Sequence, residues 1–67
     1  MRPLPHFHRP QTARTAFRAF RFEYCRCGHG RVSHMDRGRV IWRSGWHHQG
    51  VSLTYLAALA LEEGKVP

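Results

Sequence analysis

Acidic residues are scarce in this 67-residue chain, which has four Asp and Glu against eleven Lys and Arg and a net charge of +7 with neutral histidines. Carboxylates are common general acids and bases in enzymes, so this sequence offers few candidates for that chemistry. It also contains no P-loop, no paired catalytic carboxylates and no Ser/His/Asp set in a supporting context. We therefore expect a protein that is not an enzyme.

Cysteines and long apolar runs are nearly absent as well. The two cysteines, Cys25 and Cys27, are so close in sequence that a disulfide between them would close a strained ring. The longest largely apolar run, Val51 to Leu61, has 11 residues and is too short to cross a bilayer. No apolar segment follows the N-terminal arginines, as a secretory signal would require. These absences favour a reducing, cytoplasmic location, where a close cysteine pair more often binds a metal than forms a bridge.

What the sequence has in excess is arginine, because ten of its eleven basic residues are Arg and only Lys65 is Lys. Arg makes bidentate contacts with phosphate and stacks on bases. The charge therefore predicts binding of nucleic acid, either RNA or DNA, or of a ribonucleoprotein surface. A composition biased by GC-rich codons is the alternative explanation. The residues expected to bind are Arg2, Arg9, Arg14, Arg18, Arg21, Arg37, Arg39, Arg43 and the surface aromatic Trp46.

Residues 1–15 contain three prolines and no acidic residue, and we expect them to form a flexible basic arm. Residues 16–67 then make a single small domain. A core of this size is marginal, and domains of this length often use a metal or a partner for stability.

The segment 13–24 allows two interpretations. As a helix, its first half would present one apolar face beside a row of arginines, a pattern also typical of an organelle transit peptide or a membrane-surface helix. As a strand, its second half would place Phe20, Phe22 and Tyr24 on one side. We favour a strand at about 18–24.

The rest of the chain predicts a small α+β fold. Glycines indicate turns over residues 25–38, and 39–43 reads as a short strand. The clearest element is a C-terminal helix at about 52–63, capped by Ser52 and ended by Gly64. The expected architecture is a β-hairpin followed by this helix, a ββα arrangement of the kind found in treble-clef and zinc-ribbon domains.

Metal-binding side chains crowd together only in the glycine-rich stretch that follows the predicted strand. Thiolate and imidazole are the ligands that zinc prefers, and the flanking glycines let the chain turn around an ion. The alternatives are a structural turn with free thiols, or thiol chemistry, which needs a cleft that so short a chain has little room to form. The candidate zinc ligands are Cys25, Cys27, His29 and His34, with His47 or His48 as alternates for the fourth position.

The stretch CRCGHGRVSH, Cys25 to His34, is similar to the opening C-x-C-G-H and later histidine of small bacterial zinc-ribbon-like proteins. This resemblance covers about ten residues and implies that Cys25, Cys27 and His34 are zinc ligands. In that family a second cysteine cluster follows downstream, whereas here the corresponding place holds WRSGWHH.

A second function is also consistent with the sequence. Tyr55 and Leu59 widen the apolar surface of the C-terminal helix beyond a single stripe. The chain would then be a protein-interaction module, such as a phage or mobile-element inhibitor or an accessory subunit, which binds an acidic partner through this helix.

Overall fold

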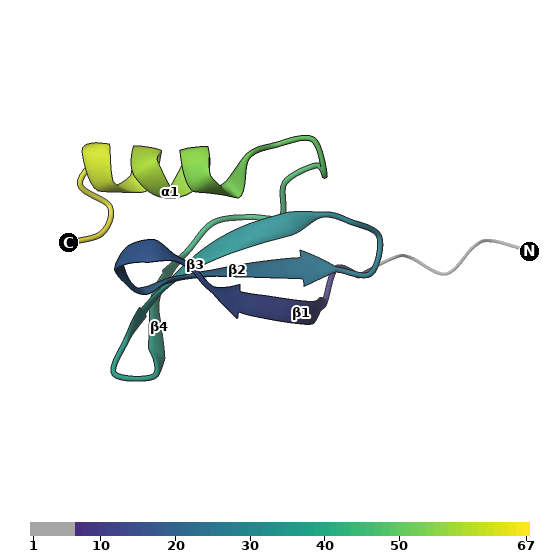
Figure 1. Ribbon diagram of the computed structural model, residues 1–67, viewed down its shortest axis with the longest axis horizontal. Coiled ribbons are helices and arrows are strands. Elements are labelled where there is room, and N and C mark those ends of the chain that lie inside the picture. The colour runs from purple at the N-terminus through teal and green to yellow at the C-terminus, as the bar shows by residue number, and fades with distance from the viewer. Residues whose placement is uncertain (1–6) are drawn as a thin grey trace, which may run out of the picture.

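Four strands lie side by side in chain order in one antiparallel sheet, and a helix lies along one face of it (Figure 1). The computed structural model describes residues 7–67. No helix within this range is long and apolar enough to cross a membrane. The elements are β1 (Pro10–Thr15), the short 3₁₀ turn η1 (Phe17–Ala19), β2 (Phe20–Cys25), β3 (Gly30–Asp36), β4 (Arg39–Arg43) and α1 (Leu53–Glu62).

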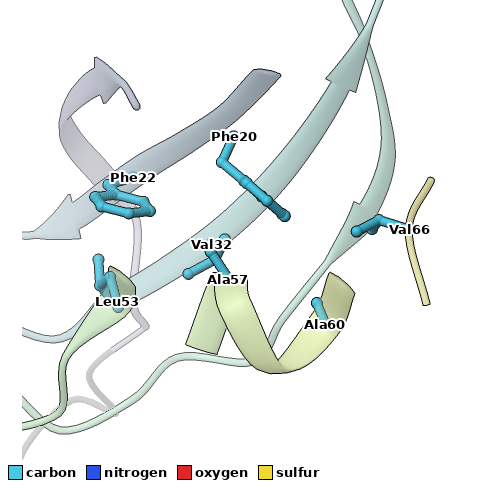
Figure 2. Close-up of a cluster of buried hydrophobic side chains, with 7 residues drawn as sticks. All are labelled: Phe20, Phe22, Val32, Leu53, Ala57, Ala60 and Val66. Carbon is cyan, nitrogen blue, oxygen red and sulfur yellow. The ribbon is translucent and has the colours of Figure 1, made fainter. Parts of the chain in front are cut away.

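The core forms between the central strands and the helix. Phe20 and Phe22 alternate along β2 and project from the same face, where Val32 of β3 lies opposite Phe22. Figure 2 shows these side chains together with four others from the C-terminal part of the chain. Those four are Leu53, Ala57 and Ala60 of α1 and Val66 beyond its end.

The helix begins and ends as its sequence predicts. The side chain of Ser52 accepts a hydrogen bond from the backbone N–H of Tyr55 at 3.2 Å. At the other end Gly64 has a φ of +73°, and the Lys65 N–H donates to the Ala60 carbonyl oxygen at 2.9 Å. These bonds satisfy backbone groups that a helix end otherwise leaves without partners.

The predicted α+β class with its C-terminal helix is confirmed, but the sheet has four strands rather than the two of a hairpin. Residues 10–15 do not belong to a flexible arm, because they form β1 at the sheet edge. Pro10 fits the first position of an edge strand, where no backbone N–H is needed. The part of the predicted arm that precedes Phe7 lies outside the described residues.

The strand interpretation of the second half of 13–24 is confirmed, since β2 occupies 20–25. The prediction of turns throughout 25–38 is wrong for Gly30–Asp36, which is β3. Val32 and His34 of β3 face the core while Arg31 and Ser33 face the other way. That alternation contains only one aliphatic residue on its inner side, so its hydrophobic signal is weak.

Candidate metal centre and arginine face

The turn after β2 is closed by backbone hydrogen bonds around its two cysteines. The N–H of Cys25 donates to the carbonyl oxygen of His29 at 2.7 Å, and the N–H of Gly28 donates to that of Cys25 at 2.9 Å. Gly28 has a φ of +94°, and a Cβ there would lie 2.5 Å from the side-chain oxygen of Gln49. The turn therefore requires glycine at this position and holds Cys25, Cys27 and His29 within one short loop.

The segment just before and at the start of β1 also lies beside this loop. Pro10, the first residue of β1, pairs with Cys25, the last residue of β2. Figure 1 shows the start of β1 and the β2–β3 turn at the same end of the sheet. The pairing brings His8, two residues before β1, alongside both cysteines, so that ligand atoms of His8, Cys25 and Cys27 all lie within 4.8 Å of one another. These three residues can hold a metal ion.

His29 lies next to this group. The Nδ1 atoms of His8 and His29 are 3.3 Å and 3.2 Å from the Cys27 sulfur, and the centroids of the two imidazole rings are 4.4 Å apart. Zinc bond lengths of about 2.3 Å to sulfur and 2.0–2.1 Å to nitrogen place tetrahedral S and N ligands about 3.6 Å from each other. The His8–Cys27 and His29–Cys27 spacings are therefore close to those of ligands around one ion, while His29 lies outside the group of three whose ligand atoms are all within 4.8 Å of one another.

Cys25 is in an environment that favours its thiolate. The backbone N–H of Cys27 is the main hydrogen-bond donor to the sulfur, and burial opposes it. The His8 side chain, the Arg9 backbone and the Cys27 side chain add further stabilisation, which together lower the pKa of Cys25 to about 5. Metals bind the thiolate form of cysteine. Cys25 is buried whereas Cys27 is exposed, so the thiol with the lowered pKa is shielded from an external electrophile.

His34, which the sequence predicted as a ligand, lies apart from the group His8, Cys25 and Cys27. His34 pairs with Phe20 at the opposite end of the β2–β3 ladder, where its ring packs edge-on against the Phe20 ring at 4.8 Å. It is not placed to complete the set, because in a strand its distance along the ladder keeps it far from the Cys25 turn. His34 instead fills the inner side of the sheet.

His47 and His48, the alternates for the fourth ligand, lie near the cysteine turn but outside the three-residue group. His47 pairs with Gly30 through two backbone hydrogen bonds of 2.7 and 3.0 Å, and this bridge returns the chain to the metal end of the sheet before α1. His48 is exposed, with its ring 5.4 Å from the ring of His29. Neither belongs to the three-residue group found in the described chain.

The sequence did not identify His8 as a site residue. Its only local signal is its place in the Pro-rich segment PHFHRP, which indicates an extended chain and no partner. Recognition of His8 requires the β1–β2 register, which is set by pairing between segments rather than by local pattern.

The face of the sheet opposite α1 holds a buried carboxylate surrounded by arginines. Glu23 accepts from Arg31 Nε at 3.2 Å and Nη2 at 3.4 Å, and also from the Ser33 hydroxyl. Arg43 Nη2 lies 3.3 Å and Arg21 Nη2 3.7 Å from the same carboxylate. Burial by itself would raise the pKa of Glu23. The hydrogen bonds from Ser33 and Arg31 and the charges of Arg31 and Arg43 outweigh it, so the pKa is lowered.

Trp46 lies between this arginine face and the cysteine turn. The Arg31 guanidinium carbon lies 4.5 Å from the centroid of the Trp46 ring, and the His8 ring lies 5.5 Å from it. Trp46 is half-buried between these two side chains, so much of its ring is already in contact with the protein.

The predicted nucleic-acid-binding arginines are spread over several surfaces. Arg2 lies outside the described residues, and Arg21 and Arg43 belong to the cluster around Glu23. Arg31 was not among the predicted residues. Its pairing with Glu23 depends on the β2–β3 register, which the local sequence does not reveal. The remaining predicted arginines, Arg9, Arg14, Arg18, Arg37 and Arg39, are exposed.

The two helix residues predicted to bind a partner, Tyr55 and Leu59, differ in their exposure to solvent. Tyr55 is 60% exposed, whereas Leu59 is half-buried. Leu59 lines a groove of about 350 Å³ that runs between α1 and the segment from Trp42 to His47. Leu56 and Ala60 also line it, together with Glu63 and Lys65, whose side chains form an ion pair at 3.0 Å.

No protein-family model, curated protein or solved structure matches this chain.

Proposed function

We propose that this chain is a small zinc-stabilised domain that binds nucleic acid, either free or within a ribonucleoprotein. The observation that carries the proposal is the position of His8 beside Cys25 and Cys27. A metal bound by these three residues would link the segment before β1 to the β2–β3 turn. The net charge of +7 and the arginines on the exposed surfaces support a polyanionic partner. Cys25 and Cys27 form no disulfide in the described chain, which is consistent with the cytoplasmic location expected from the sequence.

Zinc is the metal that the donor set favours. Two thiolates with one or two imidazoles form a soft, mixed S/N site, which suits zinc better than the oxygen-preferring cations. His29 is the fourth ligand in this proposal, since its Nδ1 lies 3.2 Å from the Cys27 sulfur. The cysteine part of the resemblance to zinc-ribbon-like proteins is retained here, with His8 and His29 in place of His34.

Native mass spectrometry of the purified chain tests the zinc site. We expect one zinc ion per chain and its loss on addition of a chelator. His8→Ala should weaken zinc binding at least about tenfold. His48→Ala is the matched control, because it removes an exposed imidazole near the site and should leave the affinity unchanged. Equal affinities for the two variants, or no zinc on the native chain, would refute the site.

Gel-shift titrations with RNA and DNA test the nucleic-acid function. Counterion release makes phosphate binding strongly dependent on salt, so we expect the affinity to fall steeply as the salt concentration rises. Absent binding, or binding that does not respond to salt, contradicts this function whatever the result with zinc.

A second candidate function is binding of an acidic protein at the groove beside α1. The observation that favours it is the groove in which the apolar side chains of Leu56 and Leu59 lie beside Lys65, which also pairs with Glu63. Replacement of Tyr55 and Leu59 by serine should abolish capture of such a partner while nucleic-acid binding persists. Loss of both activities would instead indicate a misfolded helix.

A further inference from the structure

The face of the sheet that α1 leaves uncovered carries one arginine from each of three adjacent strands. These are Arg21 of β2, Arg31 of β3 and Arg43 of β4, which we call the arginine triad. Arg21 pairs with Ser33 across β2–β3, and Ser33 pairs with Arg43 across β3–β4. Because paired residues project from the same face, the three guanidinium groups gather on one surface.

The buried carboxylate of Glu23 pairs with all three arginines of the triad. Its side chain is 3% exposed, while those of Arg21, Arg31 and Arg43 are 35%, 16% and 35% exposed. Three guanidinium groups around one carboxylate leave two positive charges in excess. Glu23 thus positions the arginines without neutralising them.

The triad retains hydrogen-bond donors. Each guanidinium group has five N–H donors, and the contacts with Glu23 and Ser33 occupy only some of them. In the described chain the buried Nε of Arg21 has no hydrogen-bond partner. A buried donor without an acceptor is costly, so the present contacts of Arg21 leave part of its hydrogen-bonding capacity unused.

We infer that the arginine triad is the surface that contacts the phosphates of single-stranded nucleic acid. This inference rests on the proposed function and assigns it to one face. Fixed guanidinium groups lose less conformational entropy on binding than mobile ones, which favours the triad over the scattered exposed arginines.

The shape of this face favours a single strand over a duplex. A duplex groove is read by a projecting helix or a two-stranded ribbon, and the triad lies on the sheet surface itself. An extended single strand can lie across such a surface with its phosphates on basic groups, and the Trp46 ring beside Arg31 adds an aromatic edge. The ribbon that would suit a duplex is the β3–β4 hairpin, which projects from the sheet and carries Arg37 and Arg39 near its tip (Figure 1).

Fluorescence anisotropy with labelled single-stranded RNA and DNA, and with duplexes of the same sequence, tests the inference. We expect Arg43→Gln to weaken single-strand binding at least about fivefold and to reduce the magnitude of the logarithmic salt slope by about 0.7. Arg37→Gln, with the same charge change at the exposed hairpin tip, is the matched control and should have a smaller effect on both. Arg43→Lys should give an intermediate affinity, since it keeps the charge but loses the planar fork. Circular dichroism verifies that each variant is folded.

The outcomes separate this inference from the function on which it rests. If the unmodified chain binds nucleic acid but Arg37→Gln weakens binding as much as Arg43→Gln, or if duplex binds more tightly, the triad is not the binding face. If the unmodified chain binds neither form at low salt, the proposed function itself fails.

Discussion

At the scale of single residues, Glu23 is a buried, ionised carboxylate in a chain that has few acidic residues. It is one of only four acidic residues in the chain, yet it is the one that the sheet buries. Its neighbours explain how this is tolerated, because Ser33, Arg31 and Arg43 all interact with its carboxylate oxygens. A buried charge is stable only when it is paired and hydrogen-bonded in this way.

The lowered pKa of Glu23 makes a prediction about acid stability. The ionised form is favoured by the fold, so its contribution is present above the unfolded-state pKa of about 4.3 and is lost as the pH falls through the lower folded value. Glu23→Gln should reduce the free energy of unfolding at pH 7 by about 1–3 kcal/mol. Between pH 7 and pH 3 the variant should then lose less stability than the unmodified chain. Urea titrations at both pH values measure this, and parallel losses would contradict the role given to Glu23.

At the scale of elements, the turn between β1 and β2 departs from its usual chemistry. Arg18 and Ala19 have φ values of 51° and 63°, which is the left-handed region in which a Cβ is strained. Residues at positive φ in hairpin turns are normally Gly, Asn or Asp. The β3–β4 turn follows that preference more closely, with Arg37 and then Gly38 at positive φ.

Ala19→Gly should therefore stabilise the protein by about 0.5–1 kcal/mol, because the relief of strain exceeds the added entropy of the unfolded chain. Ala13→Gly is the control. Ala13 lies in extended β1, so the same substitution there should destabilise. Thermal melting of both variants measures the difference, and a destabilised Ala19→Gly would show that the turn is not strained.

Local signals explain which elements the sequence predicts. The Ser52 cap and the run of good helix formers define α1, and β-branched and aromatic residues define β4. The strands β1 and β3 have no comparable signal, because β1 is polar and exposed and the inner side of β3 is formed by Gly30, Val32 and His34. For the same reason Cys25, Cys27 and His29 were found from their spacing, whereas His8 and the cross-strand partners of Glu23 depend on strand register.

At the scale of the whole molecule, stability depends on contacts at the edges of a small core. Within residues 7–67, the main apolar cluster consists of seven buried side chains, and two of them are alanines. β1 is exposed along its entire length, and in the part of the chain that the structure describes it pairs on one side only, with β2. The cluster of His8 with Cys25 and Cys27 lies at the point where β1 begins, so a bound metal would fasten this strand to the rest of the sheet.

Metal removal should therefore destabilise the whole fold and release β1 first. Zinc bound at about a thousand times its dissociation constant contributes about 4 kcal/mol, which in a domain of this size corresponds to a fall in melting temperature of at least about 10 °C when it is removed. Hydrogen exchange should show the amides of β1 losing protection before those of β2 and β3, because β1 pairs with one strand of the described sheet whereas β2 and β3 each pair with two. The His8→Ala variant should melt near the temperature of the chelated protein and respond little to chelator. An unchanged melting temperature after complete loss of the metal, with β1 still protected, would mean that the sheet holds its first strand without the ion and that the cysteine turn has another purpose.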